Sequence, residues 1–267
     1  MNKLTLILLL FTSLFCNSQN TITTYLDEDW KETSKSNASY FRKSFKTNDK
    51  KWAEYDYFIS GKIQMTSYYK TDKKKKKIGE HKFYYENGKV SLVKNFNKKG
   101  KLEGKYKKWY ENGNIDTEGN YNKKGEKYGE WKWYHENGKI SAREIYLKNE
   151  YKSGEFWNEE GVKENSEAFS QAQFPGGLKI FYKNYLTKEM KYPKEAILKN
   201  ISGKVYISFV VEKNGEISNI KIEKSVHKSI DQEALRVIKK MPNWIPGKAH
   251  NRTVRSRMKI PISFQLT

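Results

Sequence analysis

Residues 79–90 read GEHKFYYENGKV, residues 104–115 read GKYKKWYENGNI, and residues 129–140 read GEWKWYHENGKI. Each of these stretches begins 25 residues after the one before it, and Phe96, Tyr121 and Tyr146 keep the same register behind them. Self-similarity at a fixed period of this length is the signature of a repeat architecture. The middle of the chain is therefore an array of repeated structural units.

Each repeat contains a short aromatic run, then Glu-Asn-Gly, then a second apolar run. Asn-Gly is typical of a type I′ turn, in which both central residues have positive φ, so we expect each repeat to be a β-hairpin. A single hairpin is marginally stable, but neighbouring hairpins bury a continuous stripe of side chains. A degenerate copy begins at Trp52 and a truncated copy ends at Val162, so the predicted all-β array spans 52–162.

The tryptophans of the array, Trp109, Trp131 and Trp133, admit two interpretations. With their lysine neighbours they could form an exposed platform for a glycan or a protein partner, through stacking and cation–π contacts. Alternatively they form the core of a thin sheet, and we favour this because buried aromatic side chains dominate such cores. The lysine run at 73–77 interrupts the first full repeat and is interpreted as a solvated loop.

The N-terminus predicts export. Lys3 is followed by an apolar run from Leu4 to Phe15, and cleavage after Ser18 would leave small residues at the cleavage site, so residues 1–18 are expected to be a signal peptide. An uncleaved membrane anchor is the alternative, although a spanning helix needs about 20 apolar residues. Cleavage would remove Cys16, the one cysteine. Residues 19–51 carry no interpretable pattern, and 163–173 are a polar linker.

Composition argues against several functional classes. Lys and Arg outnumber Asp and Glu by 52 to 31, which gives a net charge of +21. Such a charge is compatible with nucleic acid, an anionic envelope surface or acidic partners, but the export signal argues against nucleic acid. We favour the simpler interpretation that lysines on the solvent faces and turns keep a β-rich protein soluble and block edge-to-edge aggregation. The four histidines lie at unrelated positions, without paired acids or metal-ligand spacing. We therefore expect no enzyme activity, catalytic residue, metal or cofactor.

The last hundred residues predict a separate α+β domain. A helical pattern opens at Phe174-Pro175-Gly176-Gly177, and a second short helix begins at Pro193. Alternating apolar residues at 205–211 and 217–222 flank Asn214-Gly215 and predict a hairpin. The first helix is expected to bury one face, formed by Leu178, Phe181, Tyr182 and Tyr185.

A longer helix and a final strand complete this domain. Ser229 and Gln232 are spaced as a capping box for a helix that ends before Pro242. Residues 254–266 alternate apolar and polar side chains, which indicates a half-buried antiparallel strand. Pro261 cannot donate a backbone hydrogen bond, so we expect this strand at the edge of the sheet. The result is a small antiparallel sheet with two or three helices on one face, over residues 174–267.

The motifs of this region, among them Phe174 to Gly177, Tyr192-Pro193 and Pro261-Ile262, resemble those of the TonB C-terminal domain family, and the repeats resemble MORN-variant repeats of the antitoxin type. The TonB resemblance implies recognition of an extended segment, the TonB box of an outer-membrane transporter, by strand addition. Arg255 and Arg257 would complement an acidic partner. The peptide-binding residues expected on this basis are Val254, Arg255, Ser256, Arg257, Met258, Lys259 and Tyr192.

Two functions follow as hypotheses. The first is a TonB-like binding protein of the periplasm or outer membrane, whose partner is a TonB-dependent transporter or a similar envelope protein. The second is a structural or adhesive envelope protein whose array binds glycan, lipid or a protein. An N-terminal anchor, if retained, would place the chain in the inner membrane and add motor proteins as partners. A homodimer is also compatible with the sequence.

Overall fold

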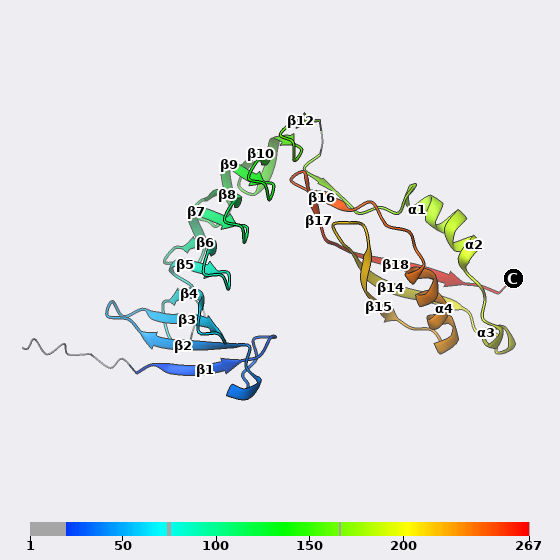
Figure 1. Ribbon diagram of the computed structural model, residues 1–267, viewed down its shortest axis with the longest axis horizontal. Coiled ribbons are helices and arrows are strands. Elements are labelled where there is room, and N and C mark those ends of the chain that lie inside the picture. Colours follow the sequence, from blue (N-terminus) through cyan, green and yellow to red (C-terminus); the bar gives the residue numbers. More distant parts are fainter. Residues whose placement is uncertain (1–19, 74–75, 166, 267) are drawn as a thin grey trace, which may run out of the picture. The chain divides into compact units, whose positions relative to one another are not determined.

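The computed structural model describes residues 20–73, 76–165 and 167–266 (Figure 1). The expected signal peptide, with Cys16, lies outside the described residues. Two compact units make up the chain: one runs to Gly113 and includes Asn120–Lys127, and the other contains Asn114–Gly119 and continues from Tyr128. No helix within the described ranges has both the length and the apolar character needed to cross a membrane.

The first unit is a run of antiparallel strands, each hydrogen-bonded to the next along the chain. Its first two strands and a short 3-10 turn, Lys35–Asn37, lie in 19–51, a segment without an interpretable sequence pattern. This segment therefore extends the array toward the N-terminus. The strands are β1 (Ile22–Leu26), β2 (Tyr40–Lys46), β3 (Trp52–Phe58), β4 (Ile63–Tyr69), β5 (Gly79–Tyr84), β6 (Val90–Phe96) and β7 (Leu102–Trp109).

Strand β8 (Ile115–Tyr121) follows, and the second unit continues the hairpin pattern. There β9 (Lys127–Tyr134), β10 (Ile140–Leu147), β11 (Glu150–Trp157) and β12 (Lys163–Glu164) pair in chain order. The predicted β-hairpin array is confirmed.

The turn type expected from Asn-Gly is wrong. In the repeat at 79–90, the N–H of Gly88 donates to the carbonyl oxygen of Tyr85 over 2.9 Å. Gly88 has φ +86°, whereas Asn87 keeps a negative φ. This is a type I turn followed by a left-handed glycine, the three-residue hairpin loop with a bulge.

The asparagine of the Glu-Asn-Gly motif forms hydrogen bonds to neighbouring backbone groups through its side chain. Asn87 Oδ1 accepts from the N–H of Lys89 at 2.9 Å, and its Nδ2 donates to the carbonyl oxygen of Glu111 at 3.3 Å. Asn137 repeats this arrangement, with 3.0 Å to the N–H of Lys139 and 2.8 Å to the carbonyl oxygen of Glu159. Each asparagine thus closes its own turn and ties it to the next turn on the same edge.

The C-terminal part of the second unit has the predicted α+β class. Strands β14 (Gly203–Val211), β15 (Ile217–Lys224) and β18 (Ser256–Phe264) form a sheet in the order β15-β14-β18, and α4 (Lys228–Lys239) contributes four buried side chains to the core. A second small sheet has the order β13-β16-β17. The remaining elements are β13 (Phe169–Ser170), α1 (Gly177–Ile180), α2 (Thr187–Glu189), α3 (Lys194–Leu198), β16 (Gly247–Ala249) and β17 (Arg252–Val254).

Two details of the predicted helices need correction. Between α1 and α2 the chain forms a π-helix, Phe181–Leu186, whose wider turn shifts the buried face. Phe181 is buried as expected, but Leu178 and Tyr182 are 47% and 37% exposed. The N-cap of α4 is His227, whose Nδ1 accepts from the N–H of Ser229, so the capping box from Ser229 to Gln232 does not form.

Candidate peptide-binding edge

Strand β18 lies at the edge of its sheet, as Pro261 predicted. It pairs with β14 at nine consecutive positions, from Gly203 opposite Phe264 to Val211 opposite Ser256. Ile260, Ile262 and Phe264 point into the core and are at most 2% exposed. Within the described residues, no other strand pairs with β18, so its second edge offers backbone groups for hydrogen bonding.

A groove of about 380 Å³ borders the first half of this strand. One wall is the segment around β13, with Phe169, Gln171 and the buried Ala172, and the other wall is β18 itself. Phe169 is 59% exposed, which is unusual for a large aromatic side chain in a domain with a complete core. The groove lining brings together four of the predicted site residues: Ser256, Arg257, Met258 and Lys259.

The two arginines of the predicted site have different surroundings. Arg255 forms a bidentate ion pair with Glu212, with distances of 2.5 Å from Nε and 2.8 Å from Nη2. This hydrogen bonding, with that from Ser218, holds the pKa of Glu212 below its usual value. Arg257 lies 3.6 Å from Glu223 and its side chain is 65% exposed. Its looser ion pair leaves it better able than Arg255 to bind an acidic partner.

Lys259 and Tyr206 share the face of the sheet that is turned away from the core. Lys259 Nζ lies 5.4 Å from the ring centroid of Tyr206, and Lys224 Nζ lies 6.0 Å from the same ring. Such cation–π contacts hold flexible lysine side chains over an aromatic surface. The outer face beside the open edge is therefore basic.

Val254 and Tyr192 lie apart from the groove. Val254 belongs to β17 and is paired with Gly247 in the second small sheet, so it is not part of β18. Tyr192 packs edge-on against Phe264, at the far end of β18, with 5.7 Å between ring centroids. Its hydroxyl donates to the carbonyl oxygen of Ile201 at 2.6 Å. Tyr192 thus packs against the sheet, and neither Val254 nor Tyr192 lines the groove beside β18.

Trp131 and Trp133 do not form an exposed platform. Trp131 and Trp133 are 1% and 3% exposed, and Trp109 is half-buried. Gly119 explains how Trp131 fits, since a Cβ at that position would lie 2.2 Å from the indole ring. The interpretation of these aromatics as sheet core agrees with this burial, because a buried indole has no face left for a ligand.

The β16–β17 hairpin supplies contacts that the sequence did not predict. Its tip residues, His250 and Asn251, have φ of +53° and +55°. Asn251 Nδ2 donates to the carbonyl oxygen of Trp157 at 3.0 Å and to Glu164 at 2.9 Å. Arg252 forms an ion pair with Asp116, whose side chain is 5% exposed, and also donates to the carbonyl oxygen of Tyr134 at 3.2 Å. The hairpin is thereby bonded to the last repeats of the array.

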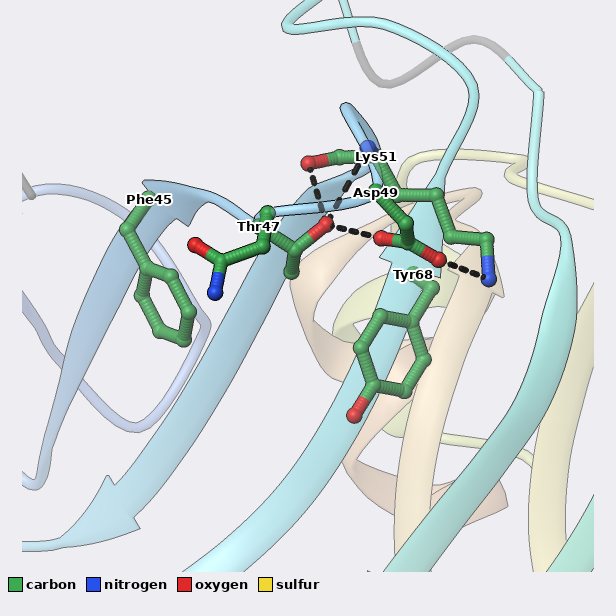
Figure 2. Close-up of a pocket in the computed structure, with 6 residues that line it drawn as sticks. Phe45, Thr47, Asp49, Lys51 and Tyr68 are labelled. Atoms are coloured by element: carbon green, nitrogen blue, oxygen red, sulfur yellow. Dashed lines mark hydrogen bonds and ion pairs between the residues drawn. The ribbon is translucent and has the colours of Figure 1, made fainter.

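A second hollow, of about 500 Å³, lies at the β2–β3 turn (Figure 2). Lys51 Nζ and Asp49 Oδ2 are 2.6 Å apart, and Thr47 Oγ1 donates to Asp49. The bond from Lys51, followed by that from Thr47, lowers the pKa of Asp49. These groups satisfy one another on an exposed turn, and no catalytic arrangement results. Across the described ranges, no group of three His, Cys, Asp or Glu side chains is positioned to hold a metal ion.

The fold and this edge define a class of protein: a β-hairpin array followed by an α+β domain in which the edge strand β18 borders a groove. Residues 188–266 match the family described as the Gram-negative bacterial TonB protein C-terminal, and residues 77–98, 102–123 and 127–149 match the MORN repeat variant. The chain therefore carries a TonB-type C-terminal domain and MORN-variant repeats. The core adds Ala172, Phe174 and Phe181, which precede the matched segment.

Two solution structures of the Helicobacter pylori TonB C-terminal domain are similar to this chain. One is 26% identical over 33% of this chain and 90% of its own length, with a TM-score of 0.26. The other is 28% identical over 34% of this chain and 80% of its own length, with a TM-score of 0.27. No curated protein matches the chain.

Proposed function

We propose that the C-terminal domain binds an extended peptide of an envelope protein by adding it as a fourth strand along β18. The observation that carries this function is the combination of an open strand edge with a groove beside its first half. Backbone hydrogen bonds would supply affinity, and the groove would select one side chain of the peptide.

Pro261 indicates which residues of β18 present their backbone to the peptide. Proline is tolerated in a strand where the missing N–H would face away from the neighbouring strand, and successive residues face opposite edges. Residues in phase with Pro261 therefore direct their N–H and C=O toward the open edge. Among them are Arg257 and Lys259, both of which line the groove.

The charges beside the edge favour an acidic or neutral peptide. Arg257 is exposed, and Lys259 lies over Tyr206 on the same face. Arg255, which is already bonded to Glu212, contributes less than the sequence suggested. A peptide carboxylate near Arg257 would form a solvent-exposed pair, which supports orientation and association rate more than affinity.

The family match indicates the setting for this function. A TonB-type domain supports a role in the cell envelope, and we propose a TonB-dependent outer-membrane transporter, or a similar envelope protein, as the partner. Peptide recognition accounts for the site without catalysis. The alternative, a glycan platform on Trp131 and Trp133, is disfavoured by the burial of both rings.

The test is a binding titration of the full chain with labelled peptides from the periplasmic ends of such transporters, with fluorescence anisotropy of the label as the readout. Two variants at one position separate backbone from side-chain contributions. Arg257→Pro removes an N–H that faces the open edge, whereas Arg257→Ala keeps it. We expect Arg257→Pro to abolish binding and Arg257→Ala to weaken it less than about tenfold. Equal affinities for both variants, with folding intact, would exclude strand addition at this edge.

A further inference from the structure

The two edges of the first unit carry different charges. In an antiparallel meander, successive turns lie alternately on opposite edges of the sheet. One edge holds the turns that follow β2, β4 and β6 and the turn that begins at Asn122. The opposite edge holds the Glu-Asn-Gly turns, with Glu86 and Glu111. We name the first of these the lysine edge, after its exposed residues Lys50, Lys73, Lys76, Lys98, Lys99, Lys101, Lys123 and Lys124.

Neighbouring turns of the lysine edge touch one another. Asn97 Nδ2 donates to the carbonyl oxygen of Lys123 at 3.0 Å. A Cβ at Gly100 would lie 3.1 Å from Cγ of Lys76, and a Cβ at Gly125 would lie 3.4 Å from Cβ of Lys101. The lysines of three successive turns therefore form one continuous row.

Few acids neutralise this row. The turns that carry it contain Asp49, Asp72 and Glu126, and Asp49 is bonded to Lys51. Glu126 accepts a hydrogen bond from Asn122 at 2.9 Å. Within residues 20–73 and 76–127, no ion pair joins a lysine of the row to a carboxylate. An uncompensated row of charges attracts a polyanion most strongly at low ionic strength.

We propose that the lysine edge binds a linear polyanion of the acidic polysaccharide class. Successive turns on one edge are two strands apart, or about 10 Å, so the positive charge recurs along a line, as the negative charge does on such a polymer. The mobile ammonium groups of lysine tolerate variable spacing of carboxylates. This function is independent of peptide binding at β18.

The twist of the sheet favours a polymer over a lipid surface. Adjacent strands rotate by about 20–25°, so turns that are two strands apart differ by about 40–50° in direction. A planar membrane can therefore meet few turns at once, whereas a flexible chain can follow the edge. The turns at 47–51, 70–78, 97–101 and 122–126 contain no aromatic residue on which nucleic-acid bases could stack.

The experiment measures binding of polygalacturonate to the full chain by calorimetry at low and high salt. The edge variant replaces Lys98, Lys99, Lys123 and Lys124 by Ser. The matched control replaces four exposed lysines of the C-terminal domain by Ser, Lys179, Lys183, Lys188 and Lys194, and so has the same net charge. We expect the edge variant to lose roughly tenfold or more in affinity, the control to lose far less, and added salt to weaken the wild type.

Additional controls separate binding at the lysine edge from effects of net charge and folding. The four Lys→Arg substitutions at the edge keep the charge and should keep binding, and circular dichroism would show that all variants are folded. Equal losses in the edge and control variants would overturn the proposal, because net charge alone would then explain binding. So would absence of binding to polygalacturonate, or stronger binding to vesicles of equal parts phosphatidylglycerol and phosphatidylcholine.

Discussion

The imidazole ring of His250 lies flat on the indole ring of Trp133, with 3.8 Å between the ring centroids and 9° between the planes. The same imidazole places Nδ1 2.7 Å from Oε1 of Glu144, a carboxylate with no exposed surface. His250 belongs to the β16–β17 hairpin of the TonB-type domain, whereas Trp133 and Glu144 belong to the repeats. The domain and the last repeats therefore share a packed interface inside the second unit.

Arg252 is expected to be the residue of this interface most sensitive to mutation. Arg252→Ala would remove the cation that pairs with the buried carboxylate of Asp116, and breaking a buried ion pair on one side costs about 3 kcal/mol of unfolding free energy. Arg255→Ala is the comparison, because the Arg255–Glu212 pair is more exposed and should contribute under about 1 kcal/mol. Urea unfolding measures both.

Adding Asp116→Asn to Arg252→Ala removes the stranded charge and should recover part of the lost stability. If Arg252→Ala costs no more than Arg255→Ala, the contact of Arg252 with the repeats would contribute no more to stability than an exposed ion pair does.

Asn137→Gly distinguishes the turn type seen in the structure from the one expected from the sequence. A type I′ turn accepts glycine at this position with little cost. In the observed turn the substitution removes the bonds to Lys139 and Glu159, so we expect a loss of about 2 kcal/mol. Thermal or urea unfolding reports the difference, and Asn137→Asp, which keeps the acceptor, should lie between. A neutral Asn137→Gly would favour the type I′ assignment.

The sequence predicts those features that depend on local pattern. The 25-residue period indicated the hairpins, and the alternation at 254–266 with Pro261 indicated an edge strand. Turn type was less accessible, because Asn-Gly occurs in both kinds of loop and the choice depends on side-chain bonds to the next repeat. The buried face of the first helix was partly wrong, since periodicity assumes an α-helix and the chain forms a π-helix at Phe181–Leu186.

Periodicity and motif spacing did not predict the contacts between segments that are far apart in the sequence. His250 and Arg252 are separated from Glu144 and Asp116 by more than a hundred residues. A histidine and an arginine in a polar turn look like ordinary surface residues, and the buried acids look like strand residues facing solvent. The groove also depends on chain folding, because Phe169 lies in a segment interpreted as a linker.

His81 should make the first unit less stable in acid. It is 1% exposed, between Tyr69 and Phe96, and burial lowers its pKa from 6.5 to about 4. Between these values the unfolded chain binds a proton that the folded chain does not, so stability falls as pH falls from about 6.5 to about 4. The full effect is on the order of 3 kcal/mol.

The measurement for His81 is urea unfolding at pH 7 and pH 4.5. His81→Phe retains an aromatic ring but cannot titrate, so it should lose less stability than the wild type between pH 7 and pH 4.5. The variant can still be less stable at pH 7, because it lacks the 3.0 Å contact of Nε2 with the carbonyl oxygen of Tyr68. Identical pH dependence in both proteins would show that His81 titrates normally in the folded state.

The last prediction concerns Phe169 in the groove beside β18. Phe169 is 59% exposed and lines the groove together with Met258, so a peptide side chain entering the groove would cover its ring. Burying part of a phenyl ring is worth about 1 kcal/mol, so Phe169→Ala should weaken peptide binding roughly fivefold to tenfold. Because the ring is exposed in the absence of peptide, the free energy of unfolding should change by less than about 0.5 kcal/mol.

Ile197 in α3 provides a matched control for Phe169. It is 51% exposed and does not line the groove, so Ile197→Ala removes a comparable apolar surface elsewhere in the domain. Calorimetric titration of the same peptide into both variants, with urea unfolding in parallel, separates affinity from stability. Strand addition with the groove as a selecting pocket requires Phe169→Ala to lose affinity and Ile197→Ala to retain it. If neither variant loses peptide affinity, the groove does not take part in binding and the backbone edge of β18 alone recognises the peptide.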